Sequence, residues 1–174
     1  MIRLSVLFLS AVMVSQPADA TDLFGGLYVH DVRLPTDASG LERGADLLLG
    51  ARGGQIAALF SAKLQPYAFG ALNTAGQTSY AAAGVSLRFD LSERVFIRPG
   101  LGLAIHNGSA SDYYRTDRVG FGSRVLFEPE LGIGTRLKDH ISVEASWVHM
   151  SHATLFSREN PGIDNLGMRL TFGL

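Results

Sequence analysis

The sequence contains no cysteine, little net charge and, after its first segment, no long hydrophobic run. The absence of cysteine excludes disulfide bonds and thiolate metal sites, and it suits an exported protein. A formal net charge of −1 provides no electrostatic attraction for nucleic acid, so we expect no nucleic-acid partner. Because a spanning helix needs about 20 apolar residues, the rest of the chain could enter a membrane only as a β-barrel.

The N-terminal segment has the pattern of a signal peptide. Arg3 supplies a positive charge, residues 4–14 form a short apolar stretch, and Ala18-Asp19-Ala20 matches an A-x-A cleavage site. We therefore predict a cleaved signal peptide at residues 1–20, followed by one domain at residues 21–174. An uncleaved anchor helix is the alternative, although the apolar stretch is too short to span a bilayer.

Glycine, aromatic residues and a period-2 alternation of apolar side chains dominate the rest of the chain. Twenty glycines, ten Phe and five Tyr favour a turn-rich β protein over a helical one. Residues 55–63 are ambiguous, because their short apolar run fits either a turn of helix or the start of a strand. The eight predicted strands cover residues 22–31, 44–52, 64–73, 78–90, 94–106, 120–137, 140–151 and 164–174.

The two faces of these predicted strands differ in an unusual way. In residues 94–106, aliphatic side chains such as Leu101 and Leu103 share one face, whereas Arg98 and Gly102 share the other. Small residues and paired charges suit the interior of a narrow barrel whose apolar face meets lipid. We predict an all-β fold, an eight-stranded antiparallel transmembrane β-barrel of the outer-membrane type. A soluble lipocalin-like barrel is the alternative.

Loop lengths orient the predicted barrel in the membrane. Outer-membrane barrels have short periplasmic turns and longer external loops. The connections at residues 91–93 and 138–139 are short, whereas those at residues 32–42, 107–118 and 152–163 are long. The sequence therefore predicts that both ends of the barrel domain lie in the periplasm and that the long loops are external.

The strongest candidate for chemistry lies at the external end of the strand at residues 140–151. His149 and Ser151 are two residues apart, so in an extended strand both project from the same face, here the lipid face. Asp164 opens the next strand with the same parity, and we expect it beside His149. A base, a hydroxyl and an acid placed in this way can form a catalytic triad. The acyl esters available in the outer leaflet are those of the membrane lipid.

The segment His149-x-Ser151, together with Asn160-Pro161-Gly162-Ile163-Asp164 before the last strand, resembles the lipid A 3-O-deacylase (PagL) family. The resemblance implies an eight-stranded outer-membrane barrel with a lipid-facing Ser-His-acid triad. It also implies hydrolysis of the ester at the 3-position of lipid A, with release of a 3-hydroxy fatty acid. By the family pattern, Ser151 is the nucleophile, His149 the base and Asp164 the orienting acid.

The same resemblance implies the surroundings of the protein. The substrate would be lipid A of lipopolysaccharide, and the location would be the bacterial outer membrane. No cofactor and no metal are implied, because ester hydrolysis by a triad needs none. The sequence leaves open whether the chain forms a homodimer.

The chain departs from the family pattern at three points. His152 stands where the family has asparagine, in a region associated with oxyanion stabilisation. Asp164 replaces the usual glutamate and is one methylene shorter. The loop at residues 152–163 is slightly longer than is typical, and it contains Glu159, our second choice for the acid.

Three other interpretations stay open. His149 and His152 could begin a metal site, but the sequence shows no third nitrogen ligand and no cysteine. Glu128 and Glu130 with Arg98 could be a catalytic carboxylate pair, although an ion network inside the barrel is the simpler explanation. Finally, the protein could be a non-catalytic small outer-membrane barrel with a structural or adhesion role.

Overall fold

The computed structural model describes residues 21–34, 40–111, 117–153 and 162–174. The predicted signal peptide at residues 1–20 and the second-choice acid Glu159 lie outside these ranges. Within them, no helix is long and apolar enough to cross a membrane. The strands are β1 (Asp22–Val29), β2 (Ala45–Arg52), β3 (Ala57–Leu59), β4 (Ala62–Asn73), β5 (Tyr80–Asp90), β6 (Val95–His106), β7 (Val125–Lys138), β8 (Ile141–Met150) and β9 (Ile163–Gly173).

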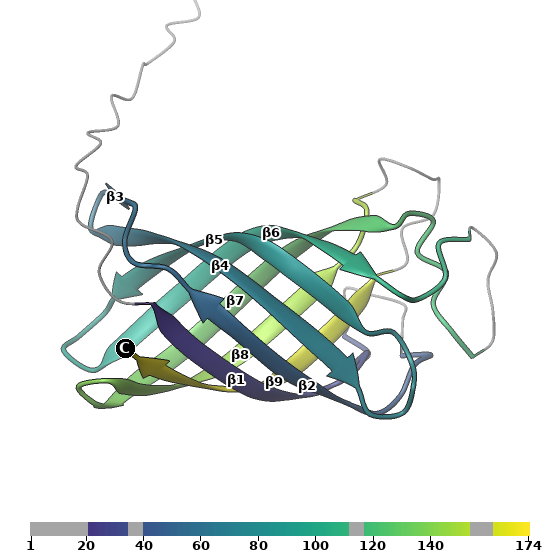
Figure 1. The fold of residues 1–174 in the computed structure, drawn as a ribbon, viewed down its shortest axis with the longest axis horizontal. Coiled ribbons are helices and arrows are strands. Elements are labelled where there is room, and N and C mark those ends of the chain that lie inside the picture. The colour runs from purple at the N-terminus through teal and green to yellow at the C-terminus, as the bar shows by residue number, and fades with distance from the viewer. Residues whose placement is uncertain (1–20, 35–39, 112–116, 154–161) are drawn as a thin grey trace, which may run out of the picture.

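All of these strands except the short β3 form the wall of a closed antiparallel barrel (Figure 1). β1 pairs with β2 and β9, the strands from β4 to β9 pair in sequence order, and β2 pairs with β4. Closure gives every wall strand two neighbours and so removes the exposed edge of an open sheet. Figure 1 shows the start of β1 and the end of β9 together at one end of the barrel. The predicted eight-stranded antiparallel barrel is confirmed.

The ambiguous segment at residues 55–63 is neither a helix nor a full wall strand. Its centre forms β3, which folds back on the start of β4 through pairs such as Ala57↔Leu64. The tight reversal places Phe60 in the left-handed region at φ 54°. This small hairpin extends from the end of the barrel at which β1 begins (Figure 1).

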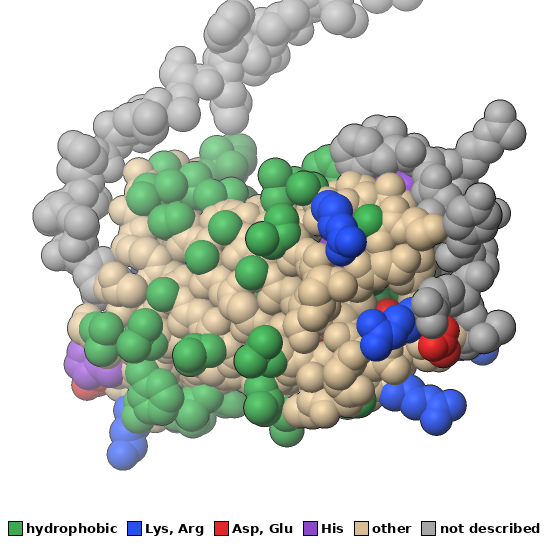
Figure 2. All heavy atoms as spheres, turned by 45° about the vertical axis from the view of Figure 1, so that its right-hand side comes forward, with side chains coloured by type: hydrophobic (Ala, Val, Ile, Leu, Met, Phe, Trp, Pro, Cys, Tyr) green, Lys and Arg blue, Asp and Glu red, His purple; other side chains and the backbone are tan. Residues whose placement is uncertain are grey.

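The outside of the barrel wall is apolar, whereas its interior combines charged, aromatic and small side chains. On β6, Leu101 and Leu103 are 57% and 54% exposed, whereas Phe96 and Arg98 are 0% and 1% exposed. Figure 2 shows hydrophobic side chains spread over the outer wall, with charged side chains mostly towards its ends. An apolar band of this extent is unfavourable in water but is the normal surface of a barrel that faces lipid. The soluble lipocalin-like alternative is therefore wrong.

Buried charged side chains pair with one another inside the barrel. Arg169 donates to Glu130 at 2.9 Å and to Glu144 at 3.4 Å, and its Nε donates to the Tyr28 hydroxyl at 3.1 Å. Arg98 contacts Glu144 from the other side at 3.3 Å. Glu130 and Glu144 thus lie against guanidinium groups, as burial of charge requires. Glu128 instead accepts a hydrogen bond from the Tyr67 hydroxyl at 2.5 Å. The interpretation as an interior ion network is therefore confirmed for Glu130 and Arg98, whereas the hydrogen-bond partner of Glu128 is uncharged.

One strand begins later than predicted. β7 starts at Val125, whereas the sequence pattern placed its start at Gly120. Gly122 adopts a φ of 67° and turns the chain, and Phe121 packs on the His106 ring with centroids 4.4 Å apart. The apolar residues before β7 therefore cover the mouth of the barrel instead of extending its wall.

Candidate active site

The candidate acid and base are direct partners across two strands. β8 and β9 pair in a register that sets His149 opposite Asp164, and Asp164 shares the outward parity of Leu166 and Met168 on β9. His149 Nδ1 lies 2.9 Å from Asp164 Oδ1. Aspartate spans the gap without the extra methylene of glutamate, because the register places the two backbones directly opposite each other.

Asp164 is far more enclosed than the other residues on its face. Its side chain is 1% exposed, whereas that of His149 is 20% exposed. Trp147 Nε1 donates to the same Oδ1 atom at 2.6 Å, and the indole stacks on the imidazole with ring centroids 5.8 Å apart. Sequence reasoning missed this hydrogen bond. The available signal was the i, i+2 spacing, which places Trp147 and His149 on one face.

Ser151 lies beside this pair, just beyond the end of β8. It pairs with Phe127 of β7 in an isolated bridge, with backbone hydrogen bonds of 2.8 and 3.1 Å. Ser151 has the parity of His149 and is 6% exposed. Among the described residues, no hydrogen bond joins its hydroxyl to the His149 ring. Such contacts in hydrolases are often long without substrate and shorten when substrate binds.

A buried imidazole joins the loops at the end of the barrel that carries the candidate site. His30 follows β1 and lies between two carboxylates, with Nδ1 2.9 Å from Asp46 and Nε2 3.1 Å from Glu42. Glu42 also accepts the N–H of Thr78 at 2.8 Å and that of Val119 at 3.1 Å. These contacts, which we call the His30 clamp, join four segments that are distant in the sequence.

The clamp keeps His30 protonated. Burial by itself would lower the pKa of His30, but its hydrogen bonds to Asp46 and Glu42 outweigh burial and raise the pKa to about 9. Burial likewise acts to raise the pKa of Glu42, yet the hydrogen bond from His30 and those from the backbone lower it. The clamp is therefore an imidazolium between carboxylates at neutral pH.

The residues after His30 attach this clamp to β9. Asp31 N–H donates to the side-chain oxygen of Asn165 at 2.9 Å, and Val32 N–H donates to the backbone carbonyl of Asp164 at 2.7 Å. The backbone of Asp164 is thus held by the loop that follows β1, as well as by the β8 ladder.

An apolar groove crosses the outer wall next to Ser151. The strand registers set Ser151 opposite Phe127, Phe127 opposite Leu103 and Leu103 opposite Ala83, so the four form one row. With strands about 4.8 Å apart, this row extends roughly 14 Å from Ser151. A groove of about 280 Å³ lies along it. The groove is lined by Ala83, Gly84, Val85, Leu101, Gly102, Leu103 and Phe127.

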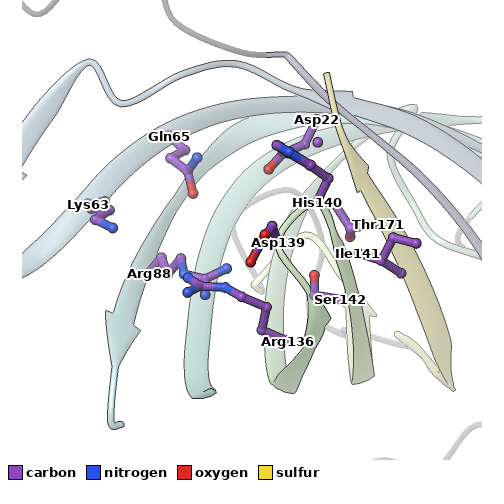
Figure 3. Close-up of a pocket in the computed structure, with 11 residues that line it drawn as sticks. Asp22, Lys63, Gln65, Arg88, Arg136, Asp139, His140, Ile141, Ser142 and Thr171 are labelled. Carbon is purple, nitrogen blue, oxygen red and sulfur yellow. The ribbon is translucent and has the colours of Figure 1, made fainter. Parts of the chain in front are cut away.

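A second His-x-Ser pair lies at the opposite end of the barrel. His140 and Ser142 line a polar pocket of about 210 Å³ where β1 begins and β9 ends (Figure 3). Figure 3 shows Asp139, Arg88 and Arg136 around the same pocket. Within the described chain, however, no carboxylate is hydrogen-bonded to the His140 ring. The structure thus distinguishes two similar sequence motifs by the presence of an acid partner.

The remaining candidates are His152, a metal site and the motif residues before β9. His152, which stands where the family has asparagine, is 0% exposed and follows Ser151 into the barrel mouth. Across the described ranges, no group of three or more His, Asp or Glu side chains is arranged to hold a metal ion. The motif residues Asn160 and Pro161 lie outside those ranges.

Comparisons with known proteins identify the relatives of this barrel. The structure is similar to the crystal structure of the outer membrane enzyme PagL, with a TM-score of 0.66 at 18% identity over 88% of this chain and 99% of that one. It is also similar to a de novo designed transmembrane β-barrel, with a TM-score of 0.55 at 8% identity over 92% and 100% of the two chains. A search among curated proteins finds no match.

The family comparison is the more specific one. A family model described as lipid A 3-O-deacylase (PagL) matches residues 46–172, which extend from β2 to β9 and include all three candidate triad residues. The resemblance inferred from the last two strands is confirmed over most of the chain. The chain therefore belongs to the lipid A 3-O-deacylase (PagL) family.

Proposed function

We propose that this protein is an outer-membrane esterase that removes the acyl chain ester-linked at the 3-position of lipid A. The observation that carries the proposal is the His149–Asp164 pair, joined at 2.9 Å on the outer face of the barrel. Ser151 follows on the same face. An enclosed acid bonded to a histidine beside a serine is the arrangement of a catalytic triad, and the name of the matching family supports this activity.

In this mechanism, Ser151 Oγ attacks the ester carbonyl while His149 Nε2 accepts the hydroxyl proton. Asp164 accepts the hydrogen bond from Nδ1–H, which keeps Nε2 as the basic nitrogen and stabilises the imidazolium that forms. Collapse of the tetrahedral intermediate breaks the bond between the carbonyl carbon and the sugar oxygen. His149 returns the proton to the departing 3-hydroxyl group. Water then hydrolyses the acyl-serine by the same route and releases the fatty acid.

The groove along the Ser151 row supports an acyl substrate. An ester whose carbonyl lies at Ser151 can extend its chain across Phe127 and Leu103 towards Ala83, entirely over apolar side chains. The chain would exchange contact with neighbouring lipid for contact with the barrel wall. Substrate entry therefore needs no opening of the barrel, whose interior is filled by charged and aromatic side chains.

The charges at the external end suit an anionic headgroup. Arg33, Arg43 and Arg124 are exposed there, as is Asp117, whereas Asp31 and Glu42 are buried and hydrogen-bonded. The exposed charge of this described surface is therefore mainly positive, which attracts phosphate groups such as those of lipid A. Together with the signal peptide predicted at residues 1–20, these features support a location in the outer membrane.

The deciding experiment compares wild-type protein with Ser151→Ala. Mass spectrometry of lipid A from expressing cells should show loss of the 3-linked acyl chain with wild type only, because the variant loses its nucleophile and about 10³-fold or more of its rate. Ser142→Ala is the matched control, since it alters the second His-x-Ser pair. Heat-modifiable migration on a gel checks that each barrel is folded. Unchanged lipid A with wild type would instead favour a non-catalytic barrel with a structural or adhesion role.

A further inference from the structure

Trp147 makes two contacts that a Ser-His-Asp triad does not require. Its indole N–H donates to Asp164 Oδ1 at 2.6 Å, the same atom that lies 2.9 Å from His149 Nδ1. Its ring stacks on the imidazole, with the planes inclined by 28° and the centroids 5.8 Å apart. One side chain therefore contacts both the acid and the base.

The strand register explains how Trp147 reaches the acid. Trp147 is opposite Leu166 and His149 is opposite Asp164, so Trp147 is the diagonal neighbour of the acid. Such diagonal positions are about 7–8 Å apart, a span that an indole can bridge. On the other side, β7 places Leu131 opposite Trp147. Among the described residues of β7 and β9, Asp164 is thus the charged residue that faces the Trp147 and His149 rings.

We propose that Trp147 is the positioning residue of this site. Its N–H orients the Asp164 carboxylate towards the imidazole, and its ring fixes the plane in which His149 faces Ser151. The inference rests on the proposed function. The second oxygen of the same carboxylate supports the inference, because Asp164 Oδ2 is buried and has no hydrogen-bond partner among the described residues. Oδ1 therefore accepts both hydrogen bonds, and an indole N–H can only donate.

This role also accounts for the aspartate. A glutamate side chain has one more rotatable bond and can reach a histidine from several backbone positions, whereas an aspartate depends on close placement. At Asp164, the register supplies the placement and the Trp147 N–H supplies the orientation. The departure from the family's usual glutamate is thereby compensated by a side chain on the neighbouring strand.

The kinetic test is a double-mutant cycle with Trp147→Phe and Asp164→Ala on purified, folded protein. Phenylalanine keeps a ring but has no donor, so kcat for lipid A deacylation should fall about 10- to 100-fold with little change in KM. In the Asp164→Ala background the same substitution should have little further effect, because alanine has no acceptor for the indole N–H. An unchanged kcat for Trp147→Phe, or an equal loss in both backgrounds, would overturn the inference.

A spectroscopic test needs no turnover, because Trp147 is the only tryptophan in the chain. The imidazole of His149 stacks on the indole, so the Trp147 emission should change in His149→Gln and stay unchanged in the control His140→Gln. Equal emission of wild-type protein and His149→Gln would refute the contact. Wild-type protein whose emission depends on His149 but which shows no deacylation would contradict the proposed function and leave the Trp147–His149 geometry supported.

Discussion

At the scale of single residues, the site depends on which acid faces His149. Asp164 lies directly opposite His149 and its side chain is enclosed, whereas Glu159 lies outside the described residues. A carboxylate that is enclosed and hydrogen-bonded can hold the imidazole in one orientation through the whole reaction.

We expect Asp164→Asn to lower kcat by about 10³- to 10⁴-fold, because an amide neither stabilises the imidazolium nor enforces the required tautomer. Glu159→Gln should retain close to wild-type kcat. Both variants are measured with purified lipid A under saturating conditions, after heat-modifiable migration confirms folding. A larger loss of kcat for Glu159→Gln than for Asp164→Asn would instead assign the role of the acid to Glu159.

At the scale of elements, β5, β6 and β7 form the groove because small residues meet at one level. Gly84 is opposite Gly102, and Ala83 is opposite Leu103. Side chains added on the inner face of the two glycines would collide with the Tyr67 hydroxyl, at 2.8 and 2.9 Å from the added atom. The barrel wall is therefore thin at the groove, and its inner side is packed against Tyr67.

Ala83→Phe should fill the far end of the groove. For long-chain lipid A we expect kcat/KM to fall about tenfold or more, as misfit in an apolar site usually causes, while a short soluble ester should be hydrolysed at the wild-type rate. The matched control is Ala81→Phe, which lies on the same face of β5 but outside the groove. Equal effects of the two variants on long and short esters would exclude the groove as the acyl site.

The His30 clamp acts on the loops rather than on the wall. The pKa of His30 is raised to about 9, so its protonated form stabilises the folded state. This stabilisation is fully present below about pH 6.5 and is lost as the pH rises through 9. His30→Gln should therefore lower the free energy of unfolding by about 3 kcal/mol at neutral pH, and by little above pH 10.

The measurement is the thermal unfolding midpoint of the detergent-solubilised barrel as a function of pH. The exposed His140 provides the control, and His140→Gln should leave the midpoint unchanged across the range. If the deficit of His30→Gln were independent of pH, the clamp would stabilise the loops by packing and not by its charge.

At the scale of the whole molecule, the interior of the barrel combines an ion network with a cluster of buried aromatic side chains. Arg169→Met would leave Glu130 and Glu144 without their shared guanidinium. Breaking a buried pair in this way usually costs about 3–5 kcal/mol, so the unfolding midpoint should fall sharply. Lys63→Met removes an exposed pair with Asp90 instead, and should cost less than about 1 kcal/mol. Similar losses for the two variants would show that the interior network contributes no more than a surface pair.

Much of this architecture could be predicted from the sequence, because alternation along a strand is a local property. The period of two places Leu101 and Leu103 on one face and Arg98 on the other in any sheet, and the glycine-rich polar face indicates a narrow interior. The same parity predicts that His149, Ser151 and Asp164 face outward together. Parity does not predict where a strand begins, so the sequence pattern extends to Gly120 although β7 starts at Val125 and Phe121 is buried before it.

The contacts between strands were decided by the tertiary structure alone. The sequence by itself determined the strand count, the inside-out polarity and the residue types available for chemistry. Barrel closure decided the register, and only the register sets Asp164 opposite His149, Trp147 diagonal to the acid, and Ser151 in line with Phe127 and the groove. The physical reason is that a shift of one residue between neighbouring strands leaves each local pattern intact but turns one strand's faces over relative to the other.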